Sequence, residues 1–252
     1  MFIFPGGFSQ RTSGRLPQES STSEMSAKSS PEPHAQHSDP PNDFKHVMIV
    51  GHRGAGKSSL VNMLLDEERA GTSSNAQSHT KENTSYNLTV YQEHVALWDT
   101  VGLDLAPNPD APSLLYVPNG QVSVVVFVLS KTITGVEEAR KYWKPVQEAT
   151  QETNLKNYGK KVPVILVVTG LENENPDSKE NNLDGWWNKN GQLFRDQGIT
   201  PDEFACVTAQ RGKFQPQMGR HVNDPRYRAS REKVLWLIAK CINGLEGQAS
   251  IS

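Results

Sequence analysis

Apolar and polar residues follow two alternating patterns along this chain. Nearly continuous apolar runs, the usual pattern of strands, occupy residues 47–50, 95–98, 122–129, 162–168 and 204–207. The two longest are expected to lie centrally and parallel in a sheet, because strands covered on both faces read as unbroken apolar runs. Residues 86–90 alternate apolar with polar side chains, which predicts a half-exposed edge strand.

Apolar residues at helical spacing separate or follow these runs. Four such segments predict helices at about residues 60–65, 136–146, 183–197 and 234–242. The second opens with a capping-box pattern that runs from Thr134 to Glu137, and Ser230 is the expected N-cap of the fourth. Strands that alternate with helices predict an α/β fold of three layers, with a mostly parallel central sheet and helices on both faces.

The two ends of the chain lack this alternation. Residues 1–44 are rich in serine and proline and poor in large apolar side chains, so they cannot offset the entropy of ordering. We therefore expect a disordered tail over residues 1–44, one domain over residues 45–245 and a short C-terminal tail over residues 246–252.

Composition narrows the function classes and the compartment. The 252-residue chain has a formal net charge of −2 at pH 7, which offers no general attraction to nucleic acid. Cys206 and Cys241 lie in apolar segments and are expected to be reduced core thiols, which predicts a reducing, cytoplasmic location. No apolar run approaches about 18 residues, so no transmembrane segment is expected; peripheral contact with a membrane stays open.

A phosphate-binding pattern follows the first predicted strand. Residues 51–58 read Gly-His-Arg-Gly-Ala-Gly-Lys-Ser, which matches Gly, four residues, Gly-Lys-Ser between a strand and a helix. The glycines let backbone N–H groups turn toward phosphate oxygens, and the helix N-terminus adds the positive end of its dipole. Lys57 would contact the β- and γ-phosphates, and Ser58 would ligate Mg²⁺. The candidate nucleotide-binding residues here are Gly51, Arg53, Gly54, Ala55, Gly56, Lys57, Ser58 and Ser59.

A second candidate phosphate-binding motif follows the strand predicted at residues 95–98. Asp99 and Gly102 have Asp-x-x-Gly spacing, in which the carboxylate can hold Mg²⁺ through water and the glycine N–H can meet the γ-phosphate. Asp99 lies 41 residues beyond Ser58, on the strand expected to neighbour the phosphate loop, so the two motifs support each other. Between them, Thr80 could present its hydroxyl to Mg²⁺, with Thr84 as the competing candidate.

With these motifs the chain resembles the P-loop GTPases of the translation-factor class and, within them, the septin-like and immunity-associated GTPase group. The resemblance rests on the phosphate loop, on Ser-His-Thr-Lys at residues 78–81 followed by a polar strand, and on Trp-Asp-Thr-Val-Gly-Leu at residues 98–103. The last is similar to the group's Asp-Thr-Pro-Gly-Leu, with Val101 in place of proline. The resemblance covers about residues 45–245 and implies a G domain that binds GTP or GDP with Mg²⁺. The metal ligands that it implies are Ser58, Thr80 and Asp99.

Members of this group read guanine with an Asn/Thr-Lys-x-Asp motif after the fifth strand. This chain has Thr-Gly-Leu-Glu there, from Thr169 to Glu172. Glu172 keeps a carboxylate that can accept two hydrogen bonds from guanine, whereas Gly170 lacks the lysine stem that covers the base. A preference for guanine with reduced affinity is expected; the alternative is a simple loop that begins an acidic run. Thr208 and Ala209 begin a tripeptide that resembles the Ser-Ala-Lys motif, whose backbone supports the base.

Hydrolysis requires a positioned water, and Leu103 stands where Ras-type proteins place a glutamine. We therefore expect weak basal GTPase activity, completed by another group or by a partner subunit as in dimerising relatives of this group. Arg53 is the candidate to stabilise charge on the γ-phosphate, in cis or across a G-domain dimer; the alternative is a solvent-facing arginine. The candidate catalytic residues are Lys57, Thr80, Gly102 and Arg53.

The favoured function is a nucleotide-dependent switch or assembly module. The γ-phosphate and Mg²⁺ would order the segments of Thr80 and Gly102, and slow hydrolysis of GTP would release them. The partners would be guanine nucleotide and either a second G domain or an effector protein. One alternative is a P-loop phosphotransferase with residues 211–231 as a phosphate-clamping lid; the other is a nucleotide-binding scaffold without turnover. The arginines of residues 220–231 are otherwise expected to form a solvated basic face.

Overall fold

The structure is a computed structural model of the whole chain. It describes residues 43–71, 82–103, 114–118, 120–132, 135–156, 160–174, 183–209, 214–215, 220–221 and 225–244. These segments all belong to one of the two units of the chain, residues 37–252. The expected tails, except for residues 43–44, and the expected roles of Thr80 and Thr134 lie outside the described residues and stay predictions.

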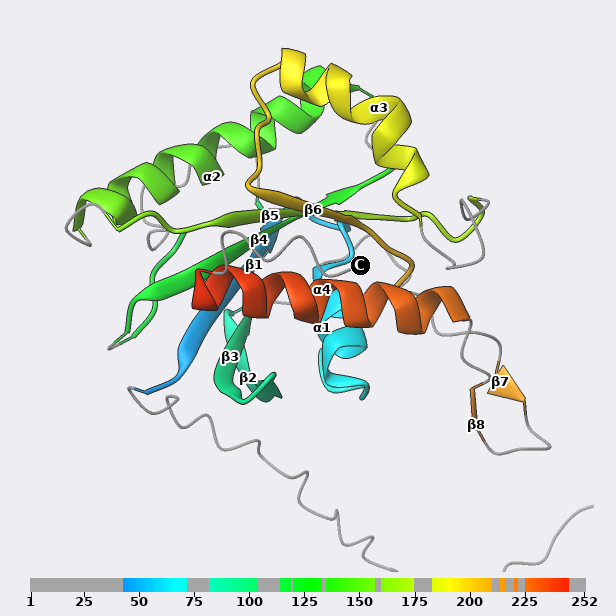
Figure 1. Cartoon of the computed structure of the whole chain (residues 1–252), viewed down its shortest axis with the longest axis horizontal. Helices are drawn as coiled ribbons and strands as arrows, with labels where there is room; N and C mark the ends of the chain where they lie inside the picture. The colour runs from blue at the N-terminus through cyan, green and yellow to red at the C-terminus, as the bar shows by residue number, and fades with distance from the viewer. Residues whose placement is uncertain are drawn as a thin grey trace, which may run out of the picture. The chain divides into compact units, whose positions relative to one another are not determined.

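Six strands form the central sheet in the order β2-β3-β1-β4-β5-β6, and β2 alone among them runs antiparallel to its neighbour (Figure 1). The predicted α/β class and the edge position of the alternating strand are therefore confirmed. A two-stranded antiparallel sheet, β7-β8, follows. The strands are β1 (Lys45–Gly51), β2 (Thr84–Val90), β3 (Glu93–Asp99), β4 (Val122–Ser130), β5 (Val164–Thr169), β6 (Glu203–Cys206), β7 (Phe214–Gln215) and β8 (Arg220–His221).

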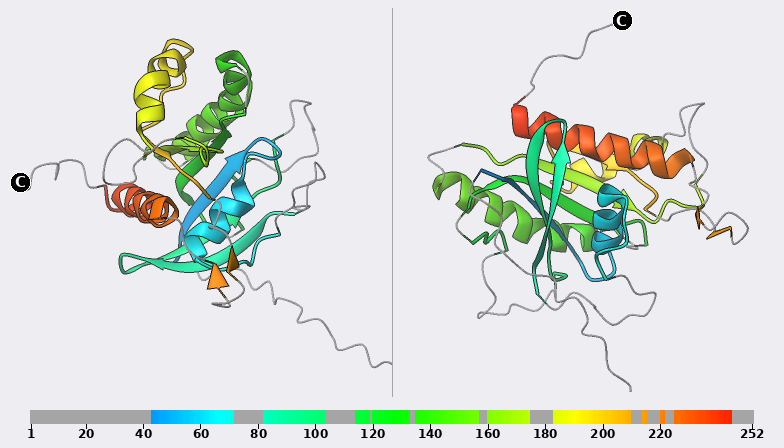
Figure 2. Two further views of the ribbon diagram at one scale, coloured as in Figure 1. Left: turned by 90° about the vertical axis from the view of Figure 1, so that its right-hand side faces the viewer. Right: turned by 90° about the horizontal axis from the view of Figure 1, so that it is seen from below.

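Helices cover both faces of the sheet and make it the middle of three layers. In the views of Figures 1 and 2, α2 and α3 lie on one face, and α1 and α4 on the other. The bounds of the helices are α1 (Lys57–Leu65), α2 (Val136–Lys156), α3 (Gly185–Asp196) and α4 (Pro225–Asn243). Among the described residues, no helix combines the length and the apolar character that crossing a membrane requires.

Two apolar cores result from the alternation of side chains along the strands. In β1, Val47 and Ile49 belong to the core beneath α1 and α4, whereas Met48 and Val50 belong to the core beneath α2 and α3. All four side chains are fully buried. Strands with both faces covered need apolar residues at every position, which is why the unbroken runs predicted the central strands correctly.

The start of α4 differs from the prediction. The helix begins at Pro225, five residues before Ser230, and proline is favoured at a first helical position because its missing N–H would have no intrahelical partner. Ser230 lies inside the helix, buried, and its Oγ accepts a hydrogen bond from the backbone N–H of Thr208 at 3.1 Å. The expected N-cap at Ser230 is therefore wrong: this serine joins the helix to the segment that follows β6.

Candidate functional site

The phosphate loop connects β1 to α1. Gly54 and Gly56 have left-handed φ angles of 73° and 89°, a conformation that glycine adopts without strain. Lys57 is buried at the first turn of α1, and its Nζ donates to the carbonyl oxygens of Gly51 and His52 at 3.3 and 3.2 Å. Burial lowers the pKa of Lys57; the nearby Asp99 opposes this shift and Arg53 adds to it. The loop thus places a buried lysine at the N-terminus of a helix, where the ammonium group and the helix dipole both favour phosphate.

The predicted magnesium pair comes together next to this loop. Ser58 Oγ donates to Asp99 Oδ2 at 2.7 Å, although the two residues are 41 positions apart. Strand pairing brings them together, because Asp99 ends β3 beside Ile49 of β1. The hydroxyl of Thr100 also donates to the carbonyl oxygen of Ile49 at 2.8 Å. A hydroxyl and a carboxylate are hard oxygen donors, so this pair fits Mg²⁺.

The segment after Asp99 is bound directly to the phosphate loop. Leu103 N donates to the carbonyl oxygen of Gly51 at 2.9 Å, and Leu103 forms a parallel bridge with His52. Gly102 lies so close to Arg53 that an added Cβ would stand 2.6 Å from Arg53 Cγ and 2.9 Å from its Cα and N. Arg53 is exposed, and its backbone requires glycine at position 102. The two predicted phosphate motifs therefore form one hydrogen-bonded unit.

The predicted base-reading segments lie at the carboxyl ends of β5 and β6. Thr169 Oγ1 donates to the carbonyl oxygen of Ala55 at 2.6 Å, which ties β5 to the phosphate loop. Glu172 is half-buried after this strand. Thr208 is buried, and Ala209 packs on the core beneath α1 and α4. The structure thus brings the described candidates together at one edge of the sheet, with the Thr169 hydroxyl turned to the loop.

His52 lies in the phosphate loop, and its sequence pattern predicted no role for it. Its Nδ1 lies 2.6 Å from the carbonyl oxygen of Arg53, and its Nε2 accepts from Ser130 N at 3.4 Å, which fits a proton on Nδ1. The ring centroid lies 5.2 Å from that of Tyr142. Burial lowers the pKa of His52; the Arg53 carbonyl opposes the shift, Lys57 adds to it, and Glu138 opposes it. Histidine spacing gave no signal for these contacts.

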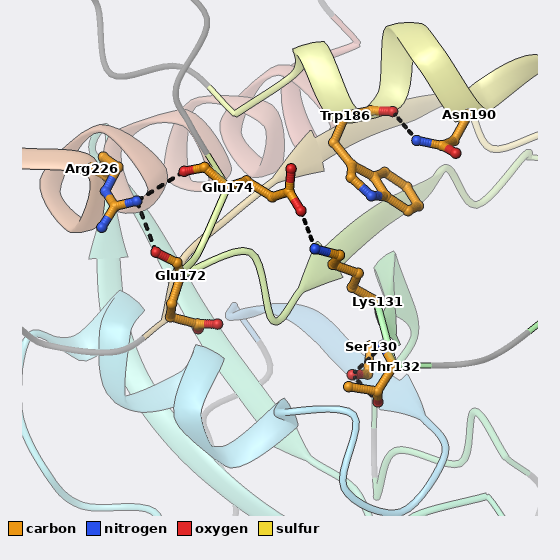
Figure 3. Close-up of polar contacts among 8 residues, drawn as sticks. All are labelled: Ser130, Lys131, Thr132, Glu172, Glu174, Trp186, Asn190 and Arg226. Carbon is orange, nitrogen blue, oxygen red and sulfur yellow. Dashed lines mark hydrogen bonds and ion pairs between the residues drawn. The ribbon is translucent and has the colours of Figure 1, made fainter.

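Lys131, Glu174 and Arg226 form a second group that the sequence did not indicate (Figure 3). Lys131 forms an ion pair with Glu174, and Arg226 Nη1 donates to the carbonyl oxygens of Glu172 and Glu174 at 2.9 and 3.1 Å. The position of Lys131 directly after a strand was the only available signal. These contacts surround the predicted base-reading segment.

The expectation of a solvated basic face is wrong for two of its arginines. Arg226 binds the loop after β5, and Arg231 Nε donates to the carbonyl oxygen of Met63 at 3.1 Å. Guanidinium groups carry several donors in a fixed plane, so they suit backbone carbonyl oxygens at helix and strand ends. The side chains of residues 210–224 lie outside the part that the structure describes.

This chain is similar in sequence to known GTPases. The model of the family described as 50S ribosome-binding GTPase matches residues 46–170, from β1 through the end of β5. This match supports a P-loop GTPase G domain over residues 46–170. Part of the G domain is also similar to GTPase Der of Chlamydia muridarum (strain MoPn / Nigg), with 39% identity over 62 residues. That match covers 25% of this chain and 12% of the relative, so the chain spans only a small part of it.

Solved structures of Toc33 from Arabidopsis thaliana share the fold of this G domain. The complex with GDP and Mg²⁺ has 18% identity and a TM-score of 0.54. The complex with Mg²⁺ and GMPPNP has 17% identity and a TM-score of 0.55. Each match covers 81% of this chain and 86% of the Toc33 chain. The three-layer architecture predicted from the sequence is therefore that of known G domains.

Proposed function

We propose that this G domain binds GTP and GDP together with Mg²⁺. The observation that carries the proposal is the 2.7 Å hydrogen bond between Ser58 and Asp99, next to the buried Lys57 of the phosphate loop. Backbone N–H groups of the loop and the Lys57 ammonium would hold the phosphates. Ser58, Asp99 and the predicted ligand Thr80 would hold Mg²⁺, which would neutralise charge on the β- and γ-phosphates.

Guanine recognition is proposed for the segment that follows β5. Glu172 occupies the position of the family's aspartate, and a carboxylate can accept hydrogen bonds from N1–H and N2–H₂ of guanine but finds no such pair on adenine. The backbone at Thr208 and Ala209 would support the other side of the base. The Toc33 complexes with GDP and GMPPNP support guanine nucleotide as the ligand of this fold.

Slow hydrolysis of GTP is the proposed activity, and a nucleotide-dependent switch or assembly module is the proposed role. Leu103 carries no polar side-chain group to orient water, and its backbone N–H is bound to Gly51. Gly102, beside Arg53, would offer its N–H to the γ-phosphate, so this segment would differ between the GTP and GDP states. We retain the septin-like and immunity-associated group as the proposed subgroup.

A second copy of the G domain is the proposed partner that completes the site, with an effector protein as the alternative. For the chloroplast translocon components atToc33 and psToc159, dimerization is important for the GTPase activity. Arg53 supports the proposal for this chain because it is exposed at the phosphate loop, where an arginine would stabilise charge in its own site or in a partner's.

A nucleotide-binding scaffold without turnover is the second candidate, and Leu103 at the water-orienting position favours it. The phosphotransferase alternative gains no support from the described arginines of its expected lid. Arg226 and Arg231 donate to backbone carbonyl oxygens of the loop after β5 and of α1.

A reducing, intracellular location remains our proposal. Cys206 and Cys241 are both free thiols. Burial is the largest cause that raises the pKa of Cys206 to about 12 and that of Cys241 to about 11. Thiols held in the protonated form react slowly, which is consistent with structural rather than catalytic cysteines.

Calorimetric titration of the full chain tests whether guanine nucleotides are preferred to adenine nucleotides. The ligands are GDP, a non-hydrolysable GTP analogue and the matching ATP analogue, each with Mg²⁺. Guanine nucleotides should bind more tightly, and Lys57→Ala should weaken them by at least about tenfold, because it removes charged hydrogen bonds. Lys144→Ala is the matched control, since this exposed lysine of α2 pairs with Glu148 on the same helix. Equal or tighter binding of the ATP analogue would refute the proposal.

Phosphate release under multiple turnover then separates the GTPase from the scaffold. A GTPase that acts as a dimer should release more phosphate per protein as protein concentration rises, and Arg53→Ala should suppress that rise. Nucleotide binding without any Lys57-dependent phosphate release would establish the scaffold instead.

A further inference from the structure

The base-reading segment lacks the side chain that normally covers the base, and its backbone explains why. Gly170 has a left-handed φ of 79°, in which a lysine would be strained. An added Cβ would lie 3.6 Å from Ser130 Oγ and 3.7 Å from Cβ and N of Lys131, which are ordinary contact distances. The space beside Gly170 is therefore bordered by Lys131, a lysine from the neighbouring strand end.

Lys131 is held in register with this segment. It follows β4 as Gly170 follows β5, and its N–H donates to the carbonyl oxygen of Thr169 at 2.9 Å. The turn that carries Lys131 is braced by Ser130 and Thr132, whose hydroxyl oxygens lie 2.7 Å apart, while Thr132 N donates to Ser130 Oγ at 3.2 Å. The backbone of Lys131 is thus tied by a hydrogen bond to the end of β5.

The side chain of Lys131 extends from the end of β4 to the loop after β5, where its ammonium pairs with Glu174 (Figure 3). The other side of this loop is held from α4, because Arg226 Nη1 donates to the carbonyl oxygens of Glu172 and Glu174. Figure 3 shows the carboxylate of Glu172 pointing away from the Arg226 guanidinium. Arg226 therefore holds the loop through main-chain oxygens, Lys131 holds it through the Glu174 side chain, and neither contact uses the Glu172 carboxylate.

We propose that Lys131 supplies the base-covering stem that Gly170 lacks, with Glu174 as the positioning residue that holds its ammonium. The aliphatic stem would cover one face of the guanine ring, and the ammonium at its end would add a cation–π attraction. Glu172 would read the edge of the same base. This inference rests on the proposed guanine-nucleotide function and adds a specificity-determining residue from a different strand.

The test compares GDP with inorganic pyrophosphate in calorimetric titrations of the full chain with Mg²⁺. Lys131→Ala should weaken GDP about tenfold, because it removes both the stem and the cation. It should leave pyrophosphate within about twofold, because the substitution is on the surface and away from the phosphate loop. Lys131→Met keeps an apolar stem without the charge and should weaken GDP by only about threefold.

Lys156→Ala is the matched control, because Lys156 also pairs with a glutamate, Glu152, but on the exposed face of α2. It should bind both ligands as the wild type does. Unchanged GDP affinity in Lys131→Ala, or an equal loss of affinity for GDP and pyrophosphate, would overturn the role of Lys131. Failure of the wild type to bind GDP in a Lys57-dependent way would instead refute the proposed function, so the two failures are distinguishable.

Discussion

Replacement of Gly102 by alanine should break the contact between the two phosphate motifs. The new Cβ would stand 2.6 Å from Arg53 Cγ and 2.9 Å from the Cα and N of Arg53. The side-chain atom can move by rotation, but the two backbone atoms can move only with the phosphate loop. The hydrogen bond from Leu103 N to the Gly51 carbonyl oxygen, one residue away, would be stretched with them.

The magnitude follows from these contacts. Forcing a methyl group into a packed site costs about 1–3 kcal/mol, and backbone contacts place this case near the middle of that range or above it. We expect the free energy of unfolding to fall by about 2 kcal/mol. For a domain of this size, that loss lowers Tm by about 4–8 °C.

Urea unfolding and thermal melts of the full chain measure this effect, with Gly135→Ala as the matched control. Gly135 precedes α2 and has no heavy atom within 4 Å of an added Cβ, so its substitution should change stability by less than about 0.5 kcal/mol. In titrations, Gly102→Ala should also lose affinity for a GTP analogue more than for GDP, because its N–H is proposed to face the γ-phosphate.

A double variant tests whether the backbone contacts of Gly102 cause the loss of stability. Adding Arg53→Ala to Gly102→Ala removes the contact with Cγ but keeps both backbone contacts, so stability should recover only in part. Full recovery would show that the side chain alone caused the loss. Equal stability of Gly102→Ala and Gly135→Ala would refute the argument altogether.

Two further predictions concern hydrogen bonds of the core. Thr169→Val removes the hydrogen bond to the Ala55 carbonyl oxygen, so the free energy of unfolding in urea should fall by about 1 kcal/mol and the affinity for GDP should fall as well. The control is Thr153→Val, on α2, which also loses a hydrogen bond to a backbone carbonyl oxygen but should leave GDP binding unchanged. His46 is buried and its Nδ1 accepts from Trp98 Nε1 at 3.1 Å; burial lowers its pKa below 6.5, so the unfolded chain binds the proton more readily. Stability should therefore fall as pH drops below 6.5, and the fall should be shallower in His46→Gln; equal slopes would contradict this.

The sequence predicted those features that depend on local repetition. The apolar run of β4 and the helical spacing of apolar residues in α2 are patterns between near neighbours in the sequence, so they can be recognised without knowledge of the fold. The Ser58–Asp99 pair was predictable as well, because the motif of each residue implies a place at the carboxyl end of a strand.

Contacts between distant surface segments left no such signal. Lys131 and Glu174 are 43 residues apart, and Arg226 and Glu172 are 54 apart, with no periodic relation between them. Ser230 misled for a related reason: serine favours helix N-caps, but its tertiary contact with Thr208 and the early start of α4 at Pro225 prevailed over that preference.

The hydrogen bond from Thr169 to Ala55 has a consequence for the additivity of ligand fragments. It joins the end of β5 to the phosphate loop within the folded chain, so the separation of the proposed base and phosphate subsites is set before a ligand arrives. Guanosine and pyrophosphate, when they bind as separate molecules, would each lose their translational and rotational entropy, whereas GDP would lose it only once. The affinity of GDP should then exceed the product of the two fragment affinities, and loosening this one bond should bring the two values closer together.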